Sequence, residues 1–179
     1  MLVTKDSLAN SMKLLANRKT LEGVCEDGFI LPWFPLSYNL TNSSELAEFL
    51  LTNIFFGKFA GSVKLSGECA EEENIWIIKR FNGKQSIDYP ITSSIGCAIR
   101  HLESSPRLAS RYVTNPVLYG DKKFDLRYFV AVKSLQPLVM ARHTQYVVRV
   151  ANDPFAKEDF ESYQKHFTVM NFIGKHLDL

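Results

Sequence analysis

Two stretches near the N-terminus repeat their hydrophobic positions at helical spacing. The first predicts a helix over 6–18, where leucine and methionine fall on one face behind an aspartate or serine cap. The second predicts a helix over 44–56, because Asn42 and Glu45 have the spacing of a capping pair. Between them, in 22–44, two prolines and several aromatic residues break the periodicity, so we expect an ordered connecting segment.

The rest of the chain alternates shorter patterns that are typical of strands and helices. Residues 74–79 form a continuous apolar run, as in a strand buried on both faces, and 92–104 has apolar residues at helical spacing behind a Thr or Ser cap. Four more strands are expected, over 108–113, 123–132, 137–142 and 145–150. Pro154 predicts the start of a closing helix within 152–166. This order indicates an α+β fold, an antiparallel sheet with flanking helices.

Length and composition narrow the class of protein. A chain of 179 residues with 46% hydrophobic and 22% charged residues suits one globular domain, or a piece of a larger one. No apolar run reaches the roughly 18 residues that a membrane span needs. Lys5 and Asp6 stand where a signal peptide would be apolar, so we expect a cytoplasmic chain with no membrane partner. Neither the cysteines nor the histidines have the spacing of a metal site, and no metal site is predicted.

Charge is distributed unevenly along the chain. Residues 1–75 have a net charge of −4 and residues 76–179 have a net charge of +6. The second part therefore suits an anionic partner, which could be a nucleotide, an acidic peptide or a nucleic acid. A solvated surface of mixed sign is the alternative reading.

The stretch KKFDLRYFVAV (122–132) places a charge at every second position. In a strand, Lys123, Asp125 and Arg127 share one face, while the apolar residues between them share the other. From Phe129 onward both faces are apolar, so we expect the charges to lie at one end of an otherwise buried strand. A strand with one wet face would explain this pattern, and so would a polyanion lying along the mouth of a sheet.

Lys79 and Arg149 are isolated cations in apolar strands. A buried charge is unfavourable unless it is paired, so each of them belongs either to a structural ion pair or to a phosphate site. Neither GxxxxGK[ST] nor GxGxxG occurs in the sequence. A phosphate loop of the common NTPase type and a dinucleotide fold are therefore not supported.

Five ordered motifs over residues 74–172 resemble the tubulin tyrosine ligase-like family. They are WIIK, SRYVTNPVL, KFDLR with its following strand that ends in PL, an isolated Arg in VVRV, and HFTVMN. The resemblance implies an ATP-grasp fold, here incomplete, with ATP between two antiparallel sheet layers. Family members activate a carboxylate of tubulin as an acyl phosphate, which the amine of an amino acid then attacks. The chain would divide into an N-terminal helical and irregular part, 1–73, and a nucleotide-binding core, 74–179.

The resemblance also implies roles for individual residues, with ATP as the cofactor. The cofactor-binding residues would be Lys79 at the phosphates, Ser110, Arg111 and Val113 at the adenine hinge, and Lys123 and Asp125 along the nucleotide. Arg127 and Arg149 would be catalytic residues at the reacting centre. Their guanidinium forks suit phosphate and carboxylate oxygens and stabilise developing charge.

Three departures from the family pattern bear on activity. Active members follow W-I-x-K with Pro and a Gly-rich lid over the phosphates, whereas this chain has RFNGKQSID with the single Gly83. Ser110 and Arg111 replace the Gln and Lys that are usual at the hinge. The carboxylates and Asn that hold magnesium in complete members come well after the HFTVMN position, and the chain ends at Leu179.

From these departures we expect a fragment or a catalytically impaired member that binds ATP, tubulin or both. The alternative is that the chain is part of an active ATP-dependent tubulin-modifying ligase. A nucleic-acid-binding module is a third reading, and no RNP-like motif favours it. The resemblance implies tubulin or microtubules as partners and a cytoplasmic location in association with the cytoskeleton.

Overall fold

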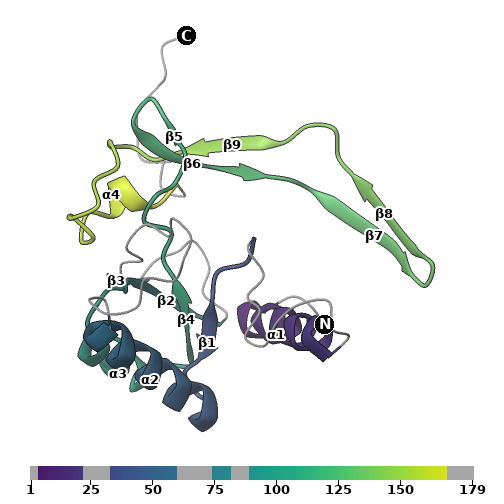
Figure 1. Cartoon of the computed structure of the whole chain (residues 1–179). Coiled ribbons are helices and arrows are strands. Elements are labelled where there is room, and N and C mark those ends of the chain that lie inside the picture. Colours follow the sequence, from purple (N-terminus) through teal and green to yellow (C-terminus); the bar gives the residue numbers. More distant parts are fainter. Residues whose placement is uncertain (1–3, 22–32, 60–73, 82–88, 169–179) are drawn as a thin grey trace. The chain divides into compact units, whose positions relative to one another are not determined.

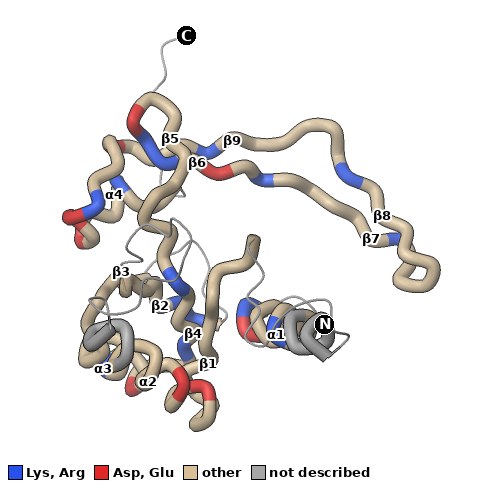
Figure 2. Tube along the Cα trace, viewed as in Figure 1, with Lys and Arg blue, Asp and Glu red and all other residues tan. Residues whose placement is uncertain are grey.

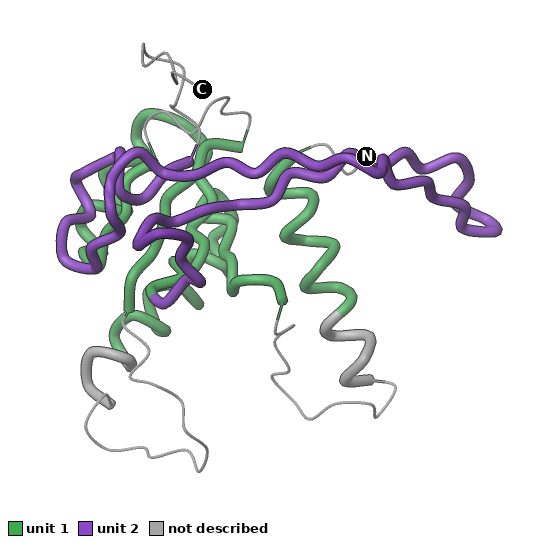
Figure 3. Tube along the Cα trace, turned by 90° about the horizontal axis from the view of Figure 1, so that it is seen from above, with its two compact units in different colours: residues 1–114 green, residues 115–179 purple. Residues whose placement is uncertain are grey.

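The computed structural model describes residues 4–21, 33–59, 74–81 and 89–168. The chain forms two compact units, residues 1–114 (unit 1) and residues 115–179 (unit 2), which are coloured separately in Figure 3. Residues 82–88, which stand where active family members have the Gly-rich lid, lie outside the described residues.

Unit 1 is built on a four-stranded antiparallel sheet (Figure 1). The strands are β1 (Ser37–Asn39), β2 (Trp76–Arg80), β3 (Ile91–Thr92) and β4 (Arg107–Arg111), in the order β1-β4-β2-β3. The helices are α1 (Lys5–Leu21), α2 (Ser43–Phe59) and α3 (Ile95–Leu102). Figure 1 shows α2 and α3 on one side of β1 and α1 on the other. The helices expected at 6–18, 44–56 and 92–104 and the strands expected at 74–79 and 108–113 are thereby confirmed.

Aromatic side chains form the core of unit 1. The Trp76 ring on β2 lies 5.1 Å from the Phe49 ring on α2 and 5.7 Å from the Tyr38 ring on β1. Side chains alternate along a strand, so Ile78 points into the same core while Lys79 points away from it. Burying each large apolar side chain contributes about 1.5–3 kcal/mol to stability. The core face of β2 therefore fixes the position of Lys79 on the opposite face.

The start of α2 is fixed by side-chain hydrogen bonds. The Asn42 side-chain oxygen accepts hydrogen bonds from the backbone N–H of Ser44 (3.0 Å) and of Glu45 (3.3 Å), which confirms Asn42 as the cap. The Glu45 carboxylate does not return to Asn42. It accepts instead from the backbone N–H of Asn39 (2.8 Å) and forms an ion pair with Lys13 on α1. Glu45 thus ties α1, β1 and α2 together.

Unit 2 contains a three-stranded sheet and a separate two-stranded ribbon. The sheet has the order β5-β6-β9, from β5 (Leu118–Tyr119), β6 (Lys122–Arg127) and β9 (Val147–Val150). The ribbon pairs β7 (Val130–Leu135) with β8 (Leu138–Arg142), and a short helix, α4 (Tyr163–His166), follows β9. All strand pairs in unit 2 are antiparallel, as expected, but β6 pairs with β9 and not with a strand that directly follows it in the chain.

The turn between β5 and β6 uses two residues with positive φ. Gly120 has φ 53° and Asp121 has φ 61°. Two consecutive left-handed residues are the requirement of a type I′ turn, whose twist matches that of the strands it joins. The turn therefore sets the register in which Tyr119 faces Lys122, and with it the position of the charged face of β6.

Two expectations about the strand at 123–132 are wrong. The chain leaves β6 after Arg127 and enters β7 at Val130, so this stretch forms two strands with different partners. It is also not buried beyond Phe129, because Val130 and Val132 are 55% and 54% exposed. Hydrophobic residues favour a strand, but the strand is buried only where another layer of structure packs against it. No described residue covers the ribbon of β7 and β8.

The expectation of a closing helix over 152–166 is also wrong for most of that range. Only Tyr163–His166 is helical, and the residues before it form turns. The backbone N–H of Phe155 donates to the Asp121 carbonyl (2.8 Å), which holds the segment against the β5–β6 turn. Phe155 and Phe160, five residues apart, both pack on the His166 ring, at 5.4 Å and 5.3 Å. A five-residue spacing does not place two side chains on one helical face, so tertiary packing prevails over the proline signal.

Candidate functional site

The charged face of β6 is organised by a pair of hydrogen bonds from Arg149 to Asp125. Arg149 Nε donates to Asp125 Oδ1 (2.6 Å) and Nη2 donates to Oδ2 (2.7 Å). Asp125 on β6 lies directly opposite Arg149 on β9, so the antiparallel register puts both side chains on one face. The hydroxyl of Thr168 donates a further hydrogen bond to Asp125 Oδ2. The ion pair that was one alternative for Arg149 is therefore present.

These contacts decide the ionisation of the pair. Burial would raise the pKa of Asp125, but hydrogen bonds from Arg149 and Thr168 and the charges of Arg149 and Lys123 together hold it below the usual value. The hydrogen bonds to Asp125 raise the pKa of Arg149. Both groups are thus ionised at neutral pH. Asp125 already accepts three hydrogen bonds, which leaves about one acceptor position of a carboxylate for a further donor.

Lys123 and Arg127 extend this face on either side of the pair. They alternate with apolar residues along β6 and so share the face of Asp125. Arg127 is exposed at the end of the strand, and its guanidinium carbon lies 5.6 Å from the centre of the Phe129 ring. Because Asp125 and Arg149 neutralise each other, the exposed guanidinium of Arg127 gives this face a positive charge. A phosphate or a carboxylate is the ligand class that such a face attracts.

In unit 1, Lys79 and Ser110 share the sheet face that points away from the Trp76 core, since Ser110 lies opposite Ile77 in the register of β2 and β4. Burial, with a smaller contribution from the charge of Lys5, lowers the pKa of Lys79 to about 8. Ser110 is 1% exposed, and its hydroxyl oxygen lies 2.9 Å from that of Ser37 on β1. Lys79 is therefore the more available of the two for an anionic ligand.

Arg111 and Val113 are placed differently from Ser110. Arg111 lies opposite Trp76 in the register, on the core face, with its guanidinium carbon 5.6 Å from the centre of the Trp76 ring. Val113 lies beyond the end of β4 and is 55% exposed. Unit 1 thus groups Lys79 with Ser110 on one face, and unit 2 groups Lys123, Asp125, Arg127 and Arg149. The nucleotide roles of these residues stay predictions.

Two residues of the site were not foreseen from the sequence. The Thr168 side chain contacts Asp125. His166, two residues before Thr168 in the chain, is 2% exposed, and its Nε2 lies 2.8 Å from the Asp159 carbonyl oxygen. Burial lowers the pKa of His166. Both belong to the HFTVMN motif, which marked the family resemblance without indicating which side chains point at β6. The motif therefore pointed to these residues in the sequence, but only the folded structure shows what their side chains contact.

Among the described residues, no group of three or more His, Cys, Asp or Glu side chains is placed to hold a metal ion. None of the described helices is long and apolar enough to cross a membrane.

Comparison with known proteins gives the family. A family model described as the tubulin-tyrosine ligase family matches residues 35–177. The tubulin-tyrosine ligase-like protein 12 of Mus musculus is 37% identical over 146 residues, covering 79% of this chain and 21% of that protein. The Caenorhabditis elegans protein of the same name is 31% identical over 149 residues, covering 80% of this chain and 20% of its own length.

Relatives named for other modifications are also similar. A tubulin polyglutamylase of Homo sapiens is 31% identical over 139 residues, covering 66% of this chain and 10% of that protein. The chain spans about a fifth of the length of the two ligase-like relatives described above. The motifs that carried the resemblance lie inside the matched region, on or next to strands β2, β4, β6 and β9 and from the last residue of α4 onward. The chain belongs to the tubulin-tyrosine ligase family.

Proposed function

We propose that the chain is an ATP-binding module of an ATP-grasp-like fold that engages tubulin and does not by itself ligate amino acids. The observation that carries this proposal is the β6 face, where a family motif, KFDLR, is arranged as a positively charged surface around the Asp125–Arg149 pair. The fold class, the ATP site and the division at 73/74 are parts of this proposal.

ATP fits the chemistry of the residues present. When bound, ATP supplies the phosphoryl group that activates a carboxylate. Lys79 and Lys123 are cations for its phosphates, and Asp125 keeps an acceptor position for a ribose hydroxyl. Arg127 and Arg149 are the guanidinium groups for the reacting phosphate and carboxylate. Ser110, Arg111 and Val113 are assigned to the adenine, although Ser110 and Arg111 point to opposite faces of the sheet.

Lys79 gives the proposal a proton-linked signature. With a pKa of about 8, its amine is partly deprotonated at pH 8 to 9. A phosphate beside it favours the charged form, so ATP binding in that pH range should take up a proton. Calorimetry in buffers of different ionisation enthalpy measures that uptake, and the Lys79→Met variant should lose it.

The proposed partner is tubulin, in a cytoplasmic and cytoskeleton-associated setting. Relatives of this chain are named as a tubulin glycylase and a tubulin polyglutamylase. The net charge of +6 on residues 76–179 favours an acidic partner. The same arginines would serve an active ligase, which is the second candidate. The absence of a Gly-rich sequence after Lys79 favours the non-ligating form.

One set of measurements tests the proposal. ATP should raise the melting temperature of the chain, Lys123→Ala and Lys79→Ala should each remove most of the rise, and Lys157→Ala, a change at an exposed lysine, should keep it. The chain should also co-sediment with microtubules. No shift with ATP in the unaltered chain would remove the nucleotide role. ATP- and Mg-dependent incorporation of labelled Tyr, Glu or Gly into tubulin would establish the active ligase instead.

A further inference from the structure

The β7–β8 ribbon has one large apolar face. Residues directly opposite in an antiparallel pair share a face, so Val132 faces the same side as Met140, and Leu135 the same side as Leu138. Val130 joins them two residues before Val132. These five side chains, the apolar face, are each between 54% and 80% exposed. An exposed apolar patch of this kind on a soluble chain marks an interaction surface.

The charge around the apolar face has one sign. Residues 126–152 contain no Asp or Glu, whereas Arg127, Lys133 and Arg142 lie along the ribbon or at its base. Figure 2 shows blue segments and no red ones along β7 and β8. Arg142 lies opposite Val130 and therefore at one end of the apolar face. A partner that covers this face meets positive charge, which favours carboxylates on the partner.

Arg142 also belongs to a stack of side chains at the base of the ribbon. Its guanidinium carbon lies 5.2 Å from the centre of the Tyr128 ring, and the Tyr128 ring lies 5.2 Å from the Tyr146 ring. Tyr128 and Tyr146 are 40% and 50% exposed. Tyrosine and arginine are the residue types that dominate binding energy at protein interfaces, and here they are already held in place by one another.

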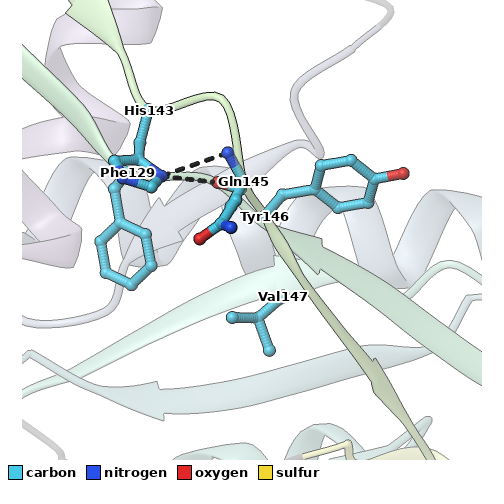
Figure 4. A pocket seen from close by; sticks show the side chains of 5 residues that line it. All are labelled: Phe129, His143, Gln145, Tyr146 and Val147. Carbon is cyan, nitrogen blue, oxygen red and sulfur yellow. Dashed lines mark hydrogen bonds between the residues drawn. The ribbon is translucent and has the colours of Figure 1, made fainter.

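A hollow lies beside this stack (Figure 4). It has a volume of about 550 Å³ and is bordered by Phe129, His143, Gln145, Tyr146 and Val147. The Gln145 backbone N–H donates to Nδ1 of His143 (3.1 Å), which fixes the rim. Three of the five lining side chains are apolar or aromatic, so the hollow suits an apolar side chain of a partner.

We propose that the β7–β8 ribbon is a docking surface for an acidic, extended polypeptide segment that carries apolar side chains. The apolar side chains would cover the apolar face and enter the hollow, and the carboxylates would meet Arg142 and Lys133. The ribbon has six residues in β7 and five in β8, so it is about 17–20 Å long, the length of about six extended residues. This surface is separate from the proposed nucleotide residues and does not depend on ATP.

Two other occupants fit less well. A second copy of the chain would bring like charges together. Two ribbons about 20 Å long and about 10 Å wide also present far less than the roughly 800 Å² per partner of a stable dimer. An anionic membrane reached by the tip would contact Leu135 and Leu138, but Val130, beside Arg142 at the other end, would stay uncovered. A slender acidic segment lying along the ribbon contacts both ends.

The test uses the whole chain and a short labelled peptide that has glutamates on both sides of a Val-Tyr-Leu core. Fluorescence anisotropy of the label measures binding of the peptide to the chain. Binding should be saturable, should weaken as salt rises, and should be absent for the same peptide with lysines in place of glutamates. Arg142→Glu should weaken binding about tenfold. The matched control Lys157→Glu reverses a charge on an exposed residue outside the ribbon and should change affinity less than about twofold.

Met140→Asp provides a second variant, because it places a carboxylate within the apolar face, and circular dichroism melting checks that each variant folds. Equal weakening by Arg142→Glu and Lys157→Glu, or no binding by the unaltered chain, would overturn the proposal. A dimer that Met140→Asp dissociates would assign the ribbon to a second copy. Arg142-dependent binding to phosphatidylserine vesicles without peptide binding would assign it to a membrane. Lys79→Ala should leave peptide binding intact, so this inference and the ATP proposal fail separately.

Discussion

The pairing of Asp125 with Arg149 limits what each residue can do alone. The resemblance indicated both as ligand contacts, and the apolar strand around Arg149 indicated that it needs a partner. The sequence did not show that the partner is Asp125, because the two are 24 residues apart and meet through the β6–β9 register. A register between strands separated by a whole ribbon depends on turns and bulges that pattern analysis does not resolve.

Asp125→Asn should lower the free energy of unfolding at pH 7 by about 0.5–1 kcal/mol, since the pair is partly open to solvent. The folded pKa of Asp125 lies below its usual value of 3.8, so its stabilisation is present above that value and is lost as the pH falls through the folded pKa. The difference between wild type and variant should therefore shrink below about pH 4.

Urea unfolding of both proteins at pH 7 and at pH 3 measures this difference. Asp153→Asn, in the same unit, is the control for a general effect of removing one negative charge. A difference that stays constant with pH would show that the Asp125 carboxylate does not stabilise the fold through its charge.

Lys79→Met should raise the stability of the chain at pH 7 by about 1–3 kcal/mol. Burial lowers the pKa of Lys79 from 10.5 to about 8, so the fold disfavours its charged form. Between these two values the unfolded chain binds the proton more readily, and the stability of the wild type rises with pH. The gap between variant and wild type should close over that range.

Melting temperatures of both proteins from pH 7 to 10.5 follow this gap. Lys157→Met controls for the loss of a positive charge at an exposed position. A gap that is unchanged by pH would mean that the amine of Lys79 is not desolvated.

Helices and strands that depend on neighbouring residues in the sequence were predicted correctly. The Asn42 cap, the Ser94 cap of α3 and the apolar run of β2 are local, and these elements are present. Strands β1, β3 and β5 have three, two and two residues, and they exist only through pairing with β4, β2 and β6. The sequence gives such short strands no periodicity to recognise. The helix expected from Pro154 failed for the related reason that its aromatic residues pack on His166.

Gly120→Ala should destabilise unit 2 by about 1–2 kcal/mol, because Gly120 has φ 53° and an L residue is strained there. No atom lies within 4 Å of the position that a Cβ would occupy, so the effect would come from backbone strain alone. Asp121→Gly at the next position, φ 61°, should be neutral or stabilising. Chemical denaturation of the two variants checks the contrast, and equal losses would contradict the turn geometry.

The division of the chain into two units predicts that a destabilising substitution in one unit affects mainly the stability of that unit. Phe49→Ala removes a ring that is 1% exposed in the core of unit 1 and should cost about 3–5 kcal/mol. Hydrogen exchange should then accelerate in β1, β2 and β4, while the amides of β6 and β9 keep their protection. Gly120→Ala should give the reverse pattern. Equal acceleration in both sheets would show that the two units unfold as one.

The register irregularity between Val132 and Ser134 has a consequence for self-assembly. It makes Lys133 the extra residue of β7, on a ribbon whose outer edges have no paired strand among the described residues. Unpaired edges next to apolar side chains template fibrils, and a lysine at a bulge is a natural protection against edge-to-edge polymerisation. We therefore expect Lys133 to oppose edge-to-edge pairing of one ribbon with another. A chain with Lys133→Val should become thioflavin-positive at concentrations at which the unaltered chain stays dispersed.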